Sequence, residues 1–187
     1  MRGNTFESRD AGISGAKIIT PFLMTDERGY FLKYYEKDIF EELGISGQPY
    51  EDFETFSTKG VIRGLHFQTE SPQAKIVHVI WGTVSDVIVD LRKGSETFGK
   101  HITIELSDQN HRLLYIPCGF GHGFEVLSDV AIMSYKCIGK YIKGADTGIH
   151  YLSEELGIEW KTDTPIVSEK DRQLMDFKVF REKYGGL

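Results

Sequence analysis

One stretch of the chain, VIRGLHFQTESPQAK at residues 61–75, concentrates side chains that could do chemistry. Arg63 can hold an anion with a planar fork of donors, and Lys75 offers a compact positive charge. His66 can move a proton near neutral pH, and Gln68 adds an amide. A half-buried strand needs polar residues only at alternate positions. The stretch therefore predicts a site for an anionic ligand, with a proton-transfer step inside it.

The spacing of Arg63 and His66 poses a geometric question. Residues three apart in an unbroken strand point to opposite faces, yet both side chains suit the same site. Either Gly64 forms a bulge that re-aims one of them, or Arg63 reaches a site that a partner chain completes. The sequence alone leaves both arrangements open.

The bulk properties limit the function classes. A length of 187 residues predicts a single domain, 1–187. The net charge of -6 gives nucleic acid or an anionic membrane no general reason to bind. Two cysteines, Cys118 and Cys137, are too few for a disulfide scaffold. Neither an apolar run of about 20 residues nor a hydrophobic signal core is found. We expect a cytoplasmic protein with reduced thiols and no membrane partner.

The elements that must position these residues are mostly short strands separated by turn signals, a pattern that favours a sandwich or barrel. Residues 1–15 are expected to be loose, residues 36–43 to form a short helix, and residues 168–184 a C-terminal helix. The predicted strands are 16–19, 30–35, 54–58, 61–68, 75–81, 83–91, 101–106, 112–116, 123–127 and 131–137. In strand 83–91, Val87, Val89 and Leu91 form a core face, while the face of Asp86 is mixed and suits a cavity wall. The prediction is one mainly β domain.

The sequence resembles the dTDP-4-dehydrorhamnose 3,5-epimerase family of nucleotide-sugar epimerases. Eight motifs carry the resemblance, in the family's order, over about residues 16–176. These motifs are DERGYF at 26–31, RGLHFQ at 63–68, PQAK at 72–75, DVIVDLRK at 86–93, PCGFGHGF at 117–124, YK at 135–136, LGIEW at 156–160 and SEKD at 168–171.

The resemblance implies a cupin-like antiparallel jelly-roll barrel with short flanking helices, assembled as a homodimer. It also implies an activity: inversion of C3 and C5 of dTDP-4-dehydro-6-deoxy-D-glucose, giving dTDP-4-dehydro-L-rhamnose, without a cofactor. An enzyme inverting only one of these carbons, or one using a CDP- or GDP-linked sugar, is the alternative. A non-catalytic sugar-binding cupin and a metal-dependent cupin oxidoreductase are more distant ones.

The resemblance also assigns roles. His66 would be the base, Asp171 would orient it, Tyr135 would return a proton from the opposite face, and Lys75 would stabilise the enolate. The residues expected to bind the substrate are Arg28, Arg63, Gln68, Asp86, His122 and Tyr141.

The residue types agree with this chemistry. A carbon acid beside a ketone needs a base with a pKa near neutrality, for which histidine at about 6.5 is suited, and a cation against the oxyanion. Ser168 and Asp171 also resemble a capping box, which is a sufficient structural reason for both. The chain contains Pro117-x-Gly119-x-x-His122 but no His-x-His pair, so we expect no metal.

Some positions depart from the family's pattern. Counting back from Arg63, Glu51 and Phe53 stand where the family usually has glutamine and asparagine that help to hold the nucleotide sugar. Cys118 stands where glutamate is common, and His78 where arginine is frequent. The proton-transfer residues are intact, whereas the residues expected to hold the nucleotide are altered.

Overall fold

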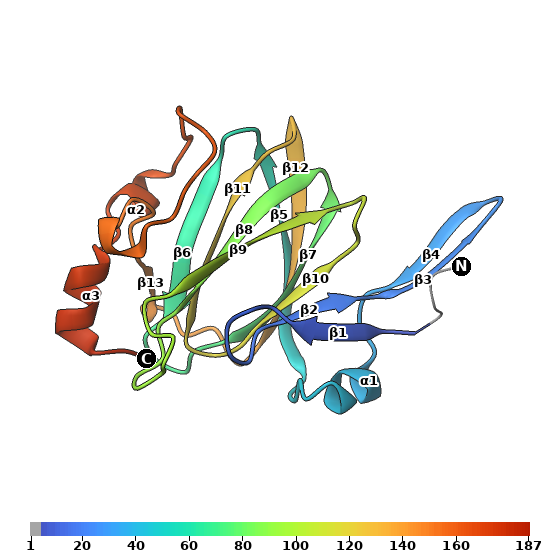
Figure 1. Cartoon of the computed structure of the whole chain (residues 1–187), viewed down its shortest axis with the longest axis horizontal. Helices are drawn as coiled ribbons and strands as arrows, with labels where there is room; N and C mark the ends of the chain where they lie inside the picture. Colours follow the sequence, from blue (N-terminus) through green and yellow to red (C-terminus); the bar gives the residue numbers. More distant parts are fainter. Residues whose placement is uncertain (1–4) are drawn as a thin grey trace.

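Two antiparallel sheets face each other in a computed structural model that describes residues 5–187 (Figure 1). The larger sheet contains, in spatial order, β1 (Glu7–Asp10), β2 (Lys17–Thr20), β10 (Leu113–Ile116), β7 (Ala74–Trp81), β12 (Val130–Ile138) and β5 (Pro49–Thr58). The smaller contains β13 (Asp146–Gly148), β6 (Ile62–Gln68), β11 (Phe120–Val126), β8 (Thr83–Asp90) and β9 (His101–Ser107). The prediction of a mainly β, antiparallel jelly roll is confirmed.

A hairpin of β3 (Phe22–Asp26) and β4 (Gly29–Lys33) projects from one end of the molecule (Figure 1). The helical segments are short: α1 (Lys37–Glu42), the 3₁₀ turn η1 (Glu154–Leu156), α2 (Glu169–Arg172) and α3 (Phe177–Tyr184). None of the helices within residues 5–187 has the length and apolar character needed to span a membrane.

Apolar side chains from both sheets meet between them. Val77 and Met133 of the larger sheet belong to the same buried cluster as Ile88 and Phe124 of the smaller one. Burying each such side chain contributes about 1.5–3 kcal/mol, so this cluster holds the sheets together. Polar side chains in the same interior line a cavity, which is described below.

The outer face of the smaller sheet is covered by the C-terminal segment, drawn in orange and red in Figure 1. Val87, Val89 and Leu91 pack there in one cluster with Phe177 and Phe180 of α3. Strand β8 is thus buried on both faces, and the predicted core face at 87, 89 and 91 is confirmed.

Each predicted strand between residues 54 and 137 is present, with small differences at the ends. The largest difference is in β5, which begins at Pro49 rather than at Glu54. Its first residues pair with the end of β12, where Pro49 lies opposite Ile138.

Two predictions about the ends of the chain are wrong. The segment 1–15 is not loose where the structure describes it, because Glu7–Asp10 pair with β2 and Ile13 is buried; residues 1–4 lie outside the described part. The C-terminal helix at 168–184 is two helices, α2 and α3. The carboxylate of Asp176 accepts a hydrogen bond from Lys178 N at 2.8 Å and so begins a new helix.

A bulge in β6 answers the question raised by Arg63 and His66. His66 pairs with His122 of β11 and Arg63 pairs with Phe124, so three steps along β6 match two along β11. Gly64 lies at this bulge with a φ of +113°. Its Cα is so close to β11 that a Cβ would lie 2.6 Å from the His122 carbonyl oxygen. Both Arg63 and His66 consequently face one cavity, as the bulge alternative requires.

We predict that Gly64→Ala lowers the free energy of unfolding by roughly 2–5 kcal/mol, because left-handed strain and overpacking against β11 combine. Gly94→Ala is the matched control: φ is +75° there, but a Cβ would meet nothing within 4 Å. The control should lose only about 1–2 kcal/mol. Urea unfolding at equal protein concentrations measures both, and equal losses would contradict the close approach at Gly64.

Candidate active site

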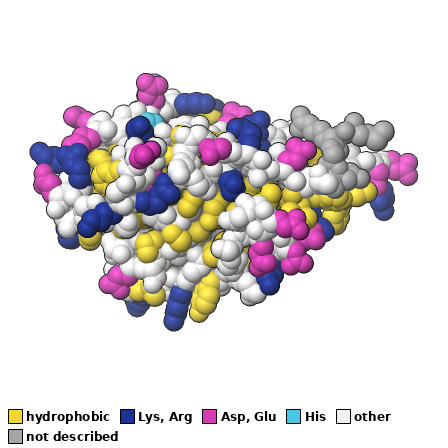
Figure 2. Space-filling view, turned by 60° about the horizontal axis from the view of Figure 1, so that its bottom comes forward, with side chains coloured by type: hydrophobic (Ala, Val, Ile, Leu, Met, Phe, Trp, Pro, Cys, Tyr) yellow, Lys and Arg dark blue, Asp and Glu magenta, His cyan; other side chains and the backbone are white. Residues whose placement is uncertain are grey.

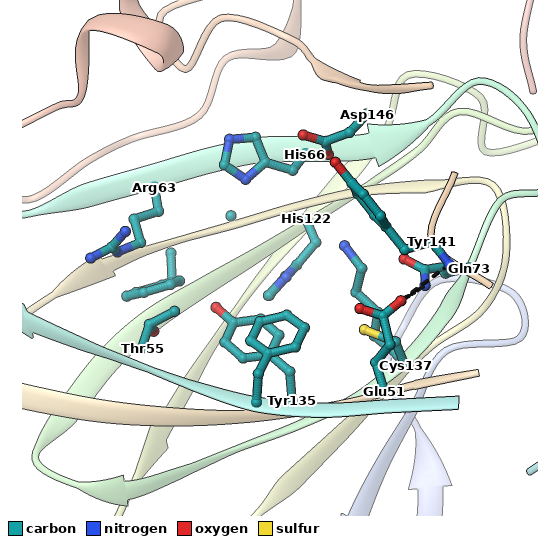
Figure 3. A pocket seen from close by; sticks show the side chains of 14 residues that line it. Glu51, Thr55, Arg63, His66, Gln73, His122, Tyr135, Cys137, Tyr141 and Asp146 are labelled. Carbon is teal, nitrogen blue, oxygen red and sulfur yellow. Dashed lines mark hydrogen bonds between the residues drawn. The ribbon is translucent and has the colours of Figure 1, made fainter. Parts of the chain in front are cut away.

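A cavity of about 320 Å³ lies between the two sheets (Figure 3). Side chains from both sheets line it, and most of them can hydrogen-bond or carry charge. The lining residues are Glu51, Phe53, Thr55, Arg63, His66, Gln73, Lys75, His122, Gly123, Phe124, Tyr135, Cys137, Tyr141 and Asp146.

His66 is held by Asp171. The imidazole Nε2 lies 2.7 Å from Asp171 Oδ1, and Asp171 Oδ2 accepts a hydrogen bond from Gly64 N at 3.1 Å. The Ser168 hydroxyl accepts from Asp171 N, so the capping interaction is also present. Burial by itself would raise the pKa of the Asp171 carboxyl, but hydrogen bonds from His66, Gly64 and Ser168 hold it below its ordinary 3.8. An ionised Asp171 fixes the ring and stabilises it when it is protonated.

A second histidine–aspartate pair lies deeper. His122 Nε2 is 2.8 Å from Asp86 Oδ2, and both side chains are buried. The other oxygen of Asp86, Oδ1, is buried without a partner. No group of three or more His, Cys, Asp or Glu side chains between residues 5 and 187 is arranged to hold a metal ion.

Tyr135 faces the cavity from β12, in the sheet opposite His66 (Figure 3). Its ring stacks on Phe53, with ring centroids 4.8 Å apart, and its hydroxyl donates to Met133 Sδ at 3.4 Å. Burial raises the pKa of this hydroxyl far above its ordinary value, and the charge of Asp86 raises it further. Tyr135 is therefore protonated at neutral pH and can donate a proton to a ligand.

Lys75 brings a cation to the same cavity from β7. Burial lowers the pKa of its ammonium group, whereas the nearby Cys137, Asp146 and Asp86 act to raise it. Cys137 lies beside it on β12, and burial raises the pKa of that thiol to about 11, so the thiol is neutral at pH 7. A desolvated cation interacts strongly with an oxyanion.

Arg63 lies at the end of the cavity beside β5. Its Nε donates to Ser57 Oγ at 3.0 Å, and another nitrogen donates to the Phe56 carbonyl at 3.2 Å. No carboxylate within residues 5–187 pairs with it. Its charge is thus available to an anionic ligand.

Three side chains fix the segment 139–142, which carries Tyr141 on the cavity wall. Gln68 accepts from Ile142 N at 2.6 Å and donates to the Lys140 carbonyl at 3.2 Å. Glu51 Oε1 accepts from Tyr141 N at 3.1 Å and from the Gln73 amide at 3.1 Å. Gln73 also donates to the Gly139 carbonyl at 2.9 Å. Every residue of the segment has a backbone group held in place.

Comparison with known proteins identifies the family. A sequence model described as dTDP-4-dehydrorhamnose 3,5-epimerase matches residues 10–179. The chain belongs to the dTDP-4-dehydrorhamnose 3,5-epimerase family.

Three relatives of this family show how far the likeness extends. A dTDP-4-dehydrorhamnose 3,5-epimerase of Methanothermobacter thermautotrophicus is 47% identical over 173 residues, which cover 91% of this chain and 92% of that one. The crystal structure of dTDP-6-deoxy-D-glucose-3,5-epimerase from Legionella pneumophila, in complex with dTDP-4-keto-L-rhamnose, superposes with a TM-score of 0.91 at 40% identity, covering 94% of each chain. A dTDP-4-dehydrorhamnose 3-epimerase of Streptomyces niveus is 40% identical, over 89% of this chain and 82% of that one.

The structure brings most of the predicted epimerase residues together. His66, Lys75, Tyr135, Arg63, His122 and Tyr141 line the cavity, and Asp171 and Asp86 stand behind the two histidines.

Two of the predicted substrate-binding residues lie elsewhere. Gln68 is not among the residues lining this cavity, because its amide is spent on the segment 139–142 and on the Ser71 carbonyl. Arg28 lies at the tip of the β3–β4 hairpin, where its side chain is 85% exposed and paired with Asp26. Neither side chain lines the cavity.

Other residues that line the cavity were not predicted from the sequence. Thr55, Gln73, Cys137 and Asp146 were not singled out, and Glu51 and Phe53 were noticed only as departures from the family's pattern. A signal was available in β5. Glu51, Phe53 and Thr55 alternate along one face, but the predicted strand began at residue 54 and hid the alternation.

We predict that Asp171→Asn lowers the free energy of unfolding by roughly 1–3 kcal/mol at pH 7, since hydrogen bonds to a charged group are lost. The pKa of Asp171 is depressed in the folded state, so its stabilisation is fully present above about 3.8 and is lost as the pH falls through the lower, folded value. The difference between parent and variant should therefore shrink as the pH falls below about 3.8 towards the lower, folded pKa. Urea unfolding across this range measures it, and a difference independent of pH would contradict the role of the charge.

Proposed function

We propose that this protein is a cofactor-independent epimerase of a nucleotide-linked 4-keto-6-deoxy sugar. One observation carries the proposal: the His66–Asp171 pair and Tyr135 face a single cavity from opposite sheets, with Lys75 beside them. A sugar ring held between the sheets would meet a base on one face and an acid on the other. Such an arrangement suits inversion at carbon, in which the new proton arrives on the face opposite to the one that lost it.

Each residue has one task in the proposed reaction. Asp171 occupies Nε2 of His66, which leaves Nδ1 to take the proton from the carbon beside the C4 ketone. The electron pair of the broken C–H bond forms the enolate, whose oxygen Lys75 stabilises. Tyr135 then gives its proton to the opposite face of the carbon, and the ketone re-forms. Arg63 holds the diphosphate, and His122 with Asp86 positions the sugar.

The substrate we propose is dTDP-4-dehydro-6-deoxy-D-glucose, inverted at C3 and C5 to give dTDP-4-dehydro-L-rhamnose. The relatives from Methanothermobacter and Legionella, by their names, support this choice. The Streptomyces niveus relative is named a 3-epimerase at 40% identity, and it favours a second candidate that inverts C3 alone. The free thiols Cys118 and Cys137 and a nucleotide-linked substrate fit a cytoplasmic enzyme.

We predict that the protein, incubated in D₂O with dTDP-4-keto-6-deoxyglucose, introduces deuterium at both C3 and C5, as followed by proton NMR. Deuterium at C3 alone would establish the 3-epimerase instead, and exchange only with a CDP- or GDP-linked sugar would show that the substrate carries that nucleotide.

We predict that His66→Ala loses at least about 10²-fold in rate, because general-base catalysis contributes roughly 10²–10⁴. His101→Ala, a histidine outside the cavity, is the control. Absence of exchange with all three nucleotide sugars would leave a sugar-binding protein.

We also propose that the enzyme is a homodimer. Figure 2 shows apolar side chains exposed across one face of the molecule. Phe56 and Trp81 are each 61% exposed, and both pair with Ile132 on the larger sheet. The projecting hairpin exposes Tyr30 and Phe31 beside Arg28. Exposed aromatic rows of this kind mark protein interfaces. A hairpin that reached the partner's cavity would deliver Arg28 to the substrate, a role it does not have in its own chain.

We predict that Arg28→Ala and His66→Ala proteins, each of low activity, complement each other after being unfolded and refolded together. Half of the dimers would be mixed, and each mixed dimer would have one intact site, so on the order of a quarter of the parental activity should return. Turnover assays of the mixture and of each variant refolded alone measure this. No gain over the separate variants would contradict a shared site.

A further inference from the structure

The proposed reaction leaves a charge for which no group has yet been assigned. When Tyr135 gives its proton to carbon, the electron pair of its O–H bond stays on the oxygen as a phenolate. Tyr135 is 7% exposed, and a buried anion is costly unless donors solvate it. Some group of the protein must therefore stabilise this oxygen.

Most of the ionisable surroundings of this hydroxyl oppose the phenolate. Burial is the main factor that raises the pKa of Tyr135, and Asp86 of β8 and Cys137 of its own strand raise it as well. His122 of β11 contacts the ring edge-on at 5.8 Å between centroids. Arg63 of β6 lowers the pKa of Tyr135, but two of its donors are engaged by Ser57 and the Phe56 carbonyl. A further donor lies on β5.

Thr55 has a hydroxyl that the fold leaves unused. Its Oγ1 is buried without a hydrogen-bond partner, although nearly all buried polar groups in proteins have one. Strand β5 runs beside β12, where Thr55 pairs with Met133 and Phe53 pairs with Tyr135, so Thr55 is a diagonal neighbour of Tyr135. In Figure 3 the Tyr135 hydroxyl points towards the part of the cavity where Thr55 and Arg63 lie. The hydroxyl of Thr55 is also close enough to lower the pKa of Tyr135.

We propose that Thr55 is a positioning residue for Tyr135, donating its hydroxyl hydrogen to the tyrosine oxygen as that oxygen becomes a phenolate. The inference rests on the proposed function. No proton leaves Thr55: the proton that forms the new C–H bond comes from Tyr135, and the hydrogen bond from Thr55 strengthens as charge develops. The interaction is selective for the state that follows proton transfer, so it accelerates reprotonation and leaves substrate binding unchanged.

Thr55→Val tests this, because valine keeps the shape of threonine and removes the donor. We expect kcat to fall roughly 10²- to 10³-fold, as for loss of one donor to a developing oxyanion, with KM nearly unchanged. Thr55→Ser keeps the hydroxyl and should restore kcat to within about threefold. Thr58→Val makes the same chemical change at an exposed position of the same strand and is the matched control.

Deuterium exchange separates this role from a merely structural one. With reprotonation slowed, the enolate more often takes a deuteron back from His66 on the original face. Two amounts are measured by NMR in D₂O: recovered substrate that carries deuterium, and inverted product. The ratio of the first to the second should therefore rise in Thr55→Val. A purely structural defect would lower both quantities together and overturn the proposal.

Other outcomes are equally decisive. An unchanged kcat in Thr55→Val, or a raised KM with kcat preserved, would overturn the proposal, the latter by placing the hydroxyl against the substrate. If Thr55→Val does not fold, Thr55→Ala measured against Thr55→Ser replaces it. Failure of the parent protein to exchange any proton would instead remove the proposed function.

Discussion

The geometry of the site depends on the two hydrogen bonds that the carboxylate of Asp171 accepts. One oxygen binds the imidazole of His66 and the other binds the backbone N–H of Gly64, two residues earlier in β6. A single buried group thus fixes the imidazole of His66 and the bulge that aims it. The helix that carries Asp171 is short, and the backbone N–H of Asp171 is itself held by Ser168. His66, the bulge at Gly64 and the C-terminal segment therefore form one hydrogen-bonded unit.

The two sheets contribute different side chains to the cavity. The smaller sheet is covered on its outer face by apolar residues of α3, so it can leave its inner face partly polar. His66 and His122, paired directly across β6 and β11, occupy that inner face, while Tyr135 and Lys75 oppose them from the larger sheet. Four buried apolar clusters within residues 5–187, the two largest of them between the sheets and beneath α3, offset the cost of the buried ionisable groups.

Much of the fold was predictable from the sequence, because alternating apolar residues and turn signals have a direct physical meaning in strands. Residues such as His66 and Tyr135 were predictable because motif and chemistry agreed. The sequence pattern could not predict where individual side chains point in the folded structure. Gln68 lies in the same motif as His66, yet its amide binds the backbone of residues 140 and 142. Arg28 is carried away by its hairpin, and the break before Asp176 coincides with a long-range bridge between Met175 and Ile149.

The segment 139–142 has a consequence beyond Tyr141. It lies in the connection from β12, which carries Tyr135, to β13, which pairs with β6 so that Gly148 lies opposite His66. The connection, residues 139–145, therefore joins the strand of Tyr135 to the sheet of His66, and its first four residues each have a backbone group held by a side chain. Adding or removing a residue there would displace Tyr141 from the cavity wall, while β12 stays paired with β5 and β7. The length of this loop is therefore one of the constraints on the shape of the cavity.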